Sequence, residues 1–524
     1  MTDGPMDWNV SHPPSGWSNR ILILAVGGIL FLTLYPFSFD FGRYLPRPQF
    51  PFSLGGWGQK IGPLEDFLNI LLFVPYGFGL AEKLRERGAS WIATFGVTLA
   101  AGALLSYAVE LLQIYIPQRD SGWEDVLTNS FGAVVGTMLF DLFGGGTLRL
   151  LSATEREARA WLTWRRAAPV LTLYLGIWCV FTVRLQEEAR LSNWNSDSLL
   201  VVGNSASNRL TSAWKGQIFA LEIWDHAVSS EFARALTSRE LADTADPDAI
   251  VAYRFSGSAP FQEGRHLLPG LSWMPQASGS ISASDVFLDG KSWLTSPSSV
   301  SALESDLEKT GQFSLRVLCE PAEINGVDAR IVSISSPSGA ANMELRQEDA
   351  SLVFWFRTPL SMQRARMSWI IPETFAASEM RDILLTFDGA SANLFINGKK
   401  HDSNYELGPG AALARVIRRI KTPELELYQY VFYTIVFFPA GCLVGLASRA
   451  LAAHGVVRLS LVLSGLVLPS VILEAVLVHV SGRTVSFENI FLSILLAASG
   501  SIWINSNRGS LHMLRSRGAL GSAR

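Results

Sequence analysis

Residues 66–80 read DFLNILLFVPYGFGL, an apolar run that begins with polar side chains and carries a proline and two glycines in its second half. Further apolar runs of comparable length lie within residues 21–185 and 426–505. At about 1.5 Å per residue, each run is long enough to cross the hydrocarbon of a bilayer as an α-helix. The chain is therefore predicted to be a polytopic α-helical membrane protein.

About eight transmembrane helices are expected. They are placed near residues 21–37, 65–81, 89–116, 122–143, 168–184, 426–448, 457–480 and 487–505. The first run has only Arg20 as a basic flank and lacks a small-residue cleavage site, so it is predicted to be a retained signal anchor. Eight crossings put both termini on one side of the membrane.

The distribution of lysine and arginine predicts which side that is. The segments on the side of the termini carry Arg20, Lys83, Arg85, Arg87, Arg149, Arg156, Arg159, Arg165, Arg166, Arg449, Arg458, Arg508, Arg515, Arg517 and Arg524. The short loops on the other side carry only Arg43, Arg47, Lys60, Arg119 and Arg483. Because cytoplasmic loops are rich in these residues, both termini are predicted to be cytoplasmic, in a bacterial plasma (inner) membrane.

One basic segment opposes this orientation. Arg415, Arg418, Arg419 and Lys421 precede the sixth span on the predicted outer side. They follow a large translocated domain, where the charge rule is weak. Together with neighbouring apolar residues they are expected to form a short interfacial helix.

Residues 190–410 contain no membrane-spanning run and are predicted to form one extracytoplasmic β-sandwich. Apolar and polar residues alternate in the segments AIVAYRF, QFSLRVLCE, ARIVSIS, NMELRQ, SLVFWFRT and DILLTF. The hairpin LLTFDGASANLFINGKK needs turns with positive φ, which Asp388-Gly389 and Asn397-Gly398 supply. With Cys319 as its only cysteine, the domain has no disulfide framework.

That hairpin resembles the laminin-G or concanavalin-like jelly-roll family. SLLVVGNS and WKGQIFALEIWDHAVSSE resemble the closing strands of the family, yet here they come first. The simplest interpretation is one circularly permuted sandwich, to which residues 190–245 give edge or closing strands; the alternative is a truncated domain followed by a second one. The resemblance implies glycan binding, sometimes with calcium, but no acidic cluster assigns a calcium site. Core packing is expected for most of Trp194, Trp214, Trp224, Trp273 and Trp355.

A polar constellation marks the first membrane segment. Its members are Asp66, Asn69, Glu110, Gln113, Arg119, Asp125 and Asn129. Glu110 and Gln113 share one helix face, as do Asp125 and Asn129. Since all lie near the outer ends of their helices, they are predicted to converge on one polar pocket. A carboxylate within a bilayer costs roughly 2.5–3.5 kcal/mol on insertion scales, which favours a functional site.

A structural interpretation stays open for the same residues. Asp125 and Asn129 would act as helix caps and interhelical hydrogen-bonding groups, and Glu110 and Arg119 would form an ion pair. A kink and close helix packing account for Pro75 and for Gly77, Gly132 and Gly136.

The stretches DFLNILLFVPYGFGL, YAVELLQIYIPQR and EDVLTNSFGAVVG together resemble the VanZ-like family of membrane proteins. The resemblance covers about residues 20–145. It implies glycopeptide tolerance, particularly to teicoplanin, in some members, by a mechanism that it does not supply.

An offset of 364 residues aligns the last three spans with spans two to four and predicts a degenerate second copy at about residues 426–505. Phe73, Pro75, Gly77, Glu110 and Arg119 fall on Phe437, Pro439, Gly441, Glu474 and Arg483. Asp66, Asn69, Gln113, Asp125 and Asn129 become Tyr430, Tyr433, Leu477, Asn489 and Ser493. Two parallel four-helix repeats are therefore expected, and the second has lost most of its polar residues.

The predicted domain order follows. Residues 1–150 form the VanZ-like unit, 151–189 a cytoplasmic linker and the fifth helix, 190–410 the sandwich, 411–510 the second unit and 511–524 a cytoplasmic tail.

The leading functional hypothesis is an envelope protein that binds or senses a surface glycan or glycolipid. One alternative is an enzyme in which Glu110 or Asp125 acts as general base on a lipid-linked substrate at the outer leaflet. Another is a transporter that uses a cavity between the two units. The spans offer no Ser-His-Asp set and no His/Cys metal cluster, and a net charge of -3 gives no indication of nucleic-acid binding.

Overall fold

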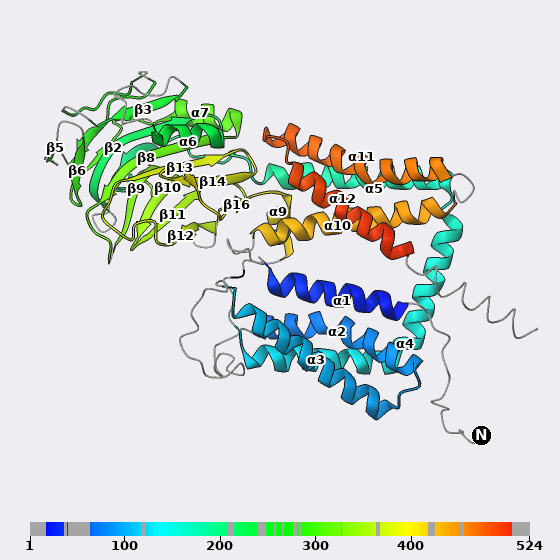
Figure 1. Cartoon of the computed structure of the whole chain (residues 1–524). Coiled ribbons are helices and arrows are strands. Elements are labelled where there is room, and N and C mark those ends of the chain that lie inside the picture. Colours follow the sequence, from blue (N-terminus) through cyan, green and yellow to red (C-terminus); the bar gives the residue numbers. More distant parts are fainter. Residues whose placement is uncertain are drawn as a thin grey trace, which may run out of the picture. The chain divides into compact units, whose positions relative to one another are not determined.

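The structure is a computed structural model, shown in Figure 1. It describes residues 17–35, 39, 63–116, 121–207, 213–238, 248–255, 258–264, 267–275, 280–281, 285–325, 327–362, 367–417, 425–450 and 455–505. The chain forms two compact units: residues 1–170, 442–462 and 499–524 belong to the first, and residues 171–441 and 463–498 to the second.

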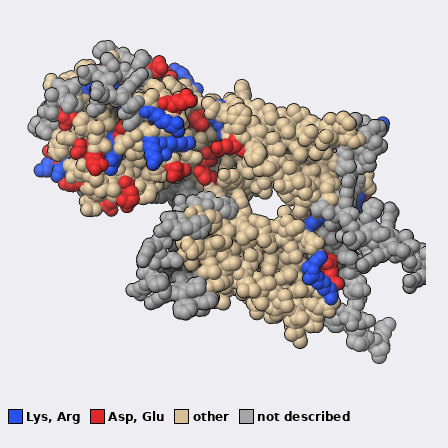
Figure 2. Space-filling model, viewed as in Figure 1, with Lys and Arg blue, Asp and Glu red and all other residues tan. Residues whose placement is uncertain are grey.

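Eight of the described helices are long and apolar enough to span a membrane, which confirms the predicted number. They are α1 (Trp17–Leu34), α2 (Pro63–Glu86), α3 (Trp91–Gln113), α4 (Trp123–Trp161), α5 (Trp164–Glu187), α10 (Leu425–Ala450), α11 (Gly455–Ser481) and α12 (Phe487–Asn505). Figure 2 shows that the flanks of these helices are almost free of charged atoms, whereas the sandwich is covered with them. The protein is therefore a multi-pass membrane protein.

Helix α4 is longer than predicted. The span was expected over 122–143 with a linker from 151, yet the helix continues to Trp161. Residues 153–160 read ATEREARA, and alanine, glutamate and arginine are strong helix formers. Glu155 on this extension pairs at 3.1 Å with Arg20, whose side chain is 1% exposed. The added turns thus compensate a buried charge on α1.

Close backbone contact joins α2 and α4 in the first four-helix unit (α1–α4). A Cβ on Gly77 would overlap the carbonyl oxygen of Ala133. Similarly, Gly132 and Gly136 of α4 lie against the backbone of Ile70 and Val74. Small residues permit such contact, and within lipid it is a main source of helix association. The packing role predicted for these glycines is confirmed.

The second four-helix unit (α5, α10–α12) has a contact of the same kind. A Cβ on Gly441 of α10 would overlap the carbonyl oxygen of Ala497 of α12. Helix α5 packs on α10, where the Tyr174 hydroxyl donates hydrogen bonds of 3.0 Å to the carbonyl oxygens of Ile435 and Val436.

Two antiparallel sheets form the β-sandwich. The seven-stranded sheet has the order β12-β11-β10-β9-β1-β7-β4; the nine-stranded sheet has β15-β14-β13-β8-β2-β6-β5, with β16 on β14 and β3 on β2. The strands are β1 (Leu199–Val202), β2 (Lys215–Trp224), β3 (Val251–Arg254), β4 (Ser272–Met274), β5 (Ser280–Ile281), β6 (Val286–Asp289), β7 (Trp293–Thr295), β8 (Phe313–Pro321), β9 (Asp328–Ser335), β10 (Ala341–Glu348), β11 (Ser351–Phe356), β12 (Trp369–Ile371), β13 (Arg381–Phe387), β14 (Ser391–Ile396), β15 (Lys399–Lys400) and β16 (Tyr405–Glu406). Three short helices accompany them: α6 (Ser230–Ser238), α7 (Ser301–Thr310) and α9 (Pro409–Ile417).

The first two strands are central, not at an edge. β1 pairs with β7 and β9, and β2 pairs with β6 and β8. An edge position for β1 and β2 is therefore wrong, and both strands belong to the same sandwich as the strands that follow them. Their apolar sequences, LLVV and IFALEIW, suit strands that are covered on both faces.

The predicted hairpin and most of the core tryptophans are confirmed. β13 and β14 pair in register, and Gly389, Asn397 and Gly398 have φ values of 93°, 49° and 71°. Trp214, Trp224 and Trp355 are buried, while Trp194 and Trp273 are half-buried. Helix α9 covers the start of the predicted interfacial helix; Arg418, Arg419 and Lys421 lie outside the described residues.

Substituting the crossing glycines tests the helix contact. Gly77→Ala and Gly441→Ala are expected to destabilise the protein by about 1–3 kcal/mol, because the new methyl group meets backbone. Gly96→Ala on α3 is the matched control, since its Cβ would meet nothing within 4 Å. Thermal unfolding of the purified protein in detergent measures the difference. Equal melting temperatures for the Gly77 and Gly96 variants would contradict the packing argument.

Glu304 of α7 is a buried acid in the sandwich. It is 3% exposed, and Asn342 Nδ2 donates a 2.7 Å hydrogen bond to its Oε1. Desolvation raises the pKa of Glu304 to about 7; the hydrogen bonds from Asn342 and Ser198 oppose the shift and the charge of Glu308 adds to it. Because the folded-state pKa is raised, its contribution to stability is full below the unfolded pKa of about 4.5 and is lost as pH rises toward 7.

Glu304→Gln is therefore expected to stabilise the protein at pH 8 by on the order of 2–3 kcal/mol and to change little at pH 4. The neutral amide removes the cost of a buried charge. Urea unfolding followed by tryptophan fluorescence at both pH values checks this, with the exposed Glu231→Gln on α6 as control. A pH-independent effect would exclude the proton linkage.

Candidate functional site

The polar residues predicted on α2, α3 and α4 lie at one end of the first four-helix unit. Asn69 near the start of α2 donates a 2.7 Å hydrogen bond from Nδ2 to Oδ1 of Asp125, near the start of α4. Asp66, one turn before Asn69, is half-buried. Asn69 and Asp125, two of the residues predicted to converge, are therefore in direct contact.

Glu110 is buried where α3 meets the beginning of α4. Its side chain is 2% exposed, and Oε2 accepts a 3.0 Å hydrogen bond from the backbone N–H of Gly122. Gly122 is the residue before α4, so its N–H has no partner within that helix. The carboxylate thus caps α4 from the neighbouring helix.

Gln113 and Asn129 each donate a hydrogen bond from the nitrogen of the side-chain amide. Gln113 Nε2 donates to the carbonyl oxygen of Thr33 at 2.9 Å, and Asn129 Nδ2 donates to Oγ of Ser106 at 2.9 Å. Gln113 is 7% and Asn129 3% exposed. Within the described part of the chain, neither amide oxygen has a hydrogen-bond partner. Two buried acceptors are thus left at this end of the unit.

Arg119 lies outside the described residues, so its pairing with Glu110 stays a prediction. Arg483, which lies 364 residues later in the sequence, is described. Arg483 Nη2 lies 2.6 Å from Glu474 Oε2, and both side chains are buried. Glu474 Oε1 also accepts a 2.7 Å hydrogen bond from the N–H of Ser486. The backbone N–H of Asn489, which lies 364 residues after Asp125, donates a 3.3 Å hydrogen bond to Ser486 Oγ.

The backbone and hydroxyl partners of the site were not predicted. The carbonyl of Thr33, the Ser106 hydroxyl and the N–H of Gly122 take part, yet none had been singled out as a site residue. Ser106 carried a usable signal, since it is polar and lies four residues before Glu110 on the same helix face. A backbone group carries none.

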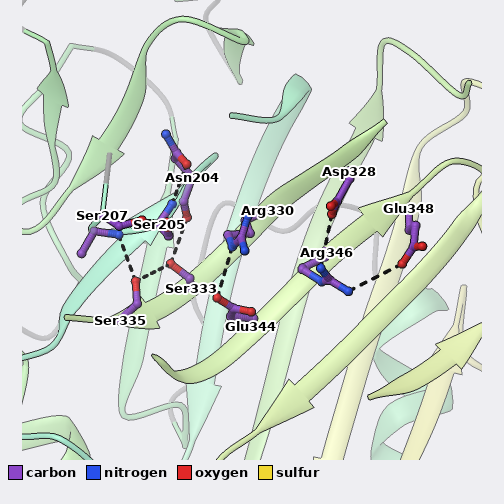
Figure 3. Close-up of polar contacts among 11 residues, drawn as sticks. Asn204, Ser205, Ser207, Asp328, Arg330, Ser333, Ser335, Glu344, Arg346 and Glu348 are labelled. Atoms are coloured by element: carbon purple, nitrogen blue, oxygen red, sulfur yellow. Dashed lines mark hydrogen bonds and ion pairs between the residues drawn. The ribbon is translucent and has the colours of Figure 1, made fainter. Parts of the chain in front are cut away.

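A second polar surface runs across β9 and β10 of the sandwich (Figure 3). Arg330 Nε lies 3.1 Å from Glu344, and Arg346 pairs with Asp328 at 3.3 Å and Glu348 at 3.6 Å. Beside this row, the Ser333 hydroxyl donates to the carbonyl oxygen of Asn204 at 2.9 Å. The Arg330–Glu344 and Arg346–Asp328 pairs join neighbouring strands, so the row has the character of sheet-stabilising cross-strand pairs.

The membrane site can act as a hydrogen-bonding surface with both acceptors and carboxylates. Among the residues that the structure describes, no group of three or more His, Cys, Asp or Glu side chains is placed to hold a metal ion. The groups that the described residues offer at this end are amide and carboxylate oxygens, which accept hydrogen bonds.

The VanZ/LLP1 family model matches residues 5–144. This region contains α1–α3, most of the apolar part of α4 and all the site residues of the first unit. The search of curated proteins found no match, and neither did the search of solved structures. The VanZ/LLP1 region thus sits in a longer chain, with the sandwich and the second helical unit following it.

A double-mutant cycle tests the Asn69–Asp125 contact. Asn69→Ala and Asp125→Ala are expected to be coupled by about 0.5–1.7 kcal/mol, the range measured for interhelical hydrogen bonds in membranes. Asn69→Ala with Asn129→Ala, whose side chains bond to different partners, should be additive. Unfolding in detergent provides the free energies. Additivity in both cycles would show that the first contact does not hold the helices together.

Proposed function

We propose that this protein is a cell-envelope membrane protein that binds an envelope glycan or the headgroup of a glycolipid at the polar end of the first four-helix unit. The observation that carries the proposal is that the buried amide oxygens of Gln113 and Asn129, next to Glu110 and Asp125, have no hydrogen-bond partner among the described residues. A buried acceptor without a partner costs about 1–3 kcal/mol. Sugar hydroxyls are hydrogen-bond donors and would recover that free energy.

The proposal includes an orientation in which both termini are cytoplasmic and residues 190–410 are extracytoplasmic, in a bacterial plasma membrane. The lysine and arginine bias supports it. The polar end would then face the outer leaflet, where envelope glycolipids present their sugars. A jelly-roll sandwich on the same side would act as a second glycan-recognition domain, an assignment that rests on the hairpin resemblance alone.

We further propose that the second four-helix unit is a degenerate copy of the first. Two contacts recur at the offset of 364 residues and support this. Gly77 lies against Ala133 as Gly441 lies against Ala497. The acid on the third helix of each unit accepts a hydrogen bond from a backbone N–H twelve residues later, Gly122 in one and Ser486 in the other.

On this proposal only the first unit keeps a ligand site. Asn69, Gln113 and Asn129 have become Tyr433, Leu477 and Ser493 in the second. The resemblance to VanZ-like proteins connects such a site with tolerance to glycopeptides of the teicoplanin type. We propose that the protein is connected with this tolerance because it binds an envelope precursor at the outer leaflet.

Binding of a polyprenyl-diphosphate disaccharide to the full chain in nanodiscs tests the proposal. Asn129→Ala and Gln113→Ala are each expected to weaken binding about tenfold, as loss of one buried hydrogen bond of roughly 1.4 kcal/mol implies. Ser493→Ala, at the equivalent position of the second unit, is the matched control and should bind like the parent protein.

The same variants, expressed in cells, should lose any teicoplanin tolerance that the parent protein confers. Melting temperatures establish that each variant is folded. Unchanged binding in the folded Asn129 and Gln113 variants would remove the basis for a ligand site in the first unit.

A further inference from the structure

The β-sandwich is seated directly on the helix ends of the second four-helix unit, within one compact unit. Gln312, at the start of β8, donates a 2.7 Å hydrogen bond to the carbonyl oxygen of Gly482, just after α11. Gln186, near the end of α5, donates 2.9 Å to the carbonyl oxygen of Gly389 in the β13–β14 turn. The two hydrogen bonds hold the sandwich to two different helices.

Two glycines of the sandwich side are pressed against helix backbone. A Cβ on Gly389 would overlap the carbonyl oxygen of Ser481, and one on Gly410 would overlap that of Tyr428. The Gly410 N–H also donates a 3.0 Å hydrogen bond to Gln429 Oε1. The backbone of this side therefore lies against the ends of both α10 and α11.

Beneath the Gly389 turn lies the Glu474–Arg483 ion pair. Glu474 is 3% and Arg483 6% exposed, and Ser481, against which Gly389 is pressed, is also buried. Arg483 N–H donates to Ser481 Oγ at 3.3 Å, so the residue under the turn is bonded to the ion pair. Glu474 occupies the position that Glu110 holds in the first unit.

The sandwich also brings carboxylates near this arginine. Desolvation raises the pKa of Glu406, on β16, to about 8; Asp388, Glu426 and Glu474 add to the shift and Arg483 opposes it. Glu406 and Asp388 belong to the sandwich, and the other three groups to the helical unit. The charges at the seat therefore interact across the contact, with the arginine as the attractive partner.

We propose that the second four-helix unit holds the sandwich in place. In this proposal the Asp388-Gly389 turn is a plug that closes one end of the second unit, the end equivalent to the polar end of the first unit. The inference stands on the contacts of the second unit and does not require a ligand at the first. On this inference the second four-helix unit anchors the sandwich, which covers its end, and only the first unit has an end available to a ligand.

Cysteine accessibility tests the plug. Ser481→Cys is introduced into the full chain in nanodiscs, where both membrane faces are open to a membrane-impermeant maleimide. The reporter is expected to react slowly in the parent protein and at least about tenfold faster with Gly389→Ala, because that methyl group overlaps the Ser481 carbonyl. Gly339→Ala is the matched control: its φ of 90° gives the same backbone strain, but its Cβ would meet nothing within 4 Å.

Cys319 reports whether the sandwich itself stays folded, because it is fully buried in β8. If Gly389→Ala makes Cys319 reactive, that variant has unfolded the sandwich and cannot test the plug. Gln186→Ala is then the test variant, since it removes a hydrogen bond to the plug without changing the sandwich. Faster labelling of the reporter with Cys319 unreactive supports the plug in either variant. Rapid labelling in the parent protein, or labelling of both variants at the rate of Gly339→Ala, would overturn it.

Discussion

The close backbone contact between α2 and α4 is the constraint on which the first unit depends. In lipid, apolar side chains gain little by meeting one another, so helices associate where small residues let their backbones approach. Gly77, Gly132 and Gly136 provide that approach along about two turns of α2 and one turn of α4. The Asn69–Asp125 hydrogen bond, 2.7 Å long, lies at the end of the same contact. Short polar side chains such as these span the gap between two helices only when the backbones are already close.

The second four-helix unit has the close glycine contact without most of the polar side chains that accompany it in the first unit. Gly441 and Ala497 keep the close contact. At the level of the polar residues, however, aromatic packing takes over: Tyr433 is stacked on Phe437 with ring centroids 5.9 Å apart. The glycine contact therefore supports a four-helix unit with or without the polar side chains. The proposed ligand site therefore depends on the polar side chains of Gln113 and Asn129 and not on the glycine contact.

Sequence reasoning succeeded where the determinant is local. The length of the apolar runs predicted the eight membrane-spanning helices, and the left-handed preference of Asn397-Gly398 predicted a hairpin turn. It failed for β1 and β2, because the place of a strand in a sheet depends on partners far along the chain: Leu200 pairs with Ile334. The same limit applies to the site. Its side chains were predicted, but the Thr33 carbonyl that binds Gln113 is 80 residues away and carries no side-chain signal.

The two buried carboxylates, Glu474 and Glu110, are compensated by different groups. A carboxylate inside a bilayer protein needs compensation, since desolvation of a charge costs several kcal/mol. Glu474 has an arginine at 2.6 Å, a backbone N–H at 2.7 Å and the sandwich above it. Removing water strengthens the ion pair, and so the docked domain and the Glu474–Arg483 pair favour each other. Glu110 accepts a hydrogen bond from the Gly122 N–H, and among the described residues the amide oxygens of its neighbours Gln113 and Asn129 have no hydrogen-bond partner.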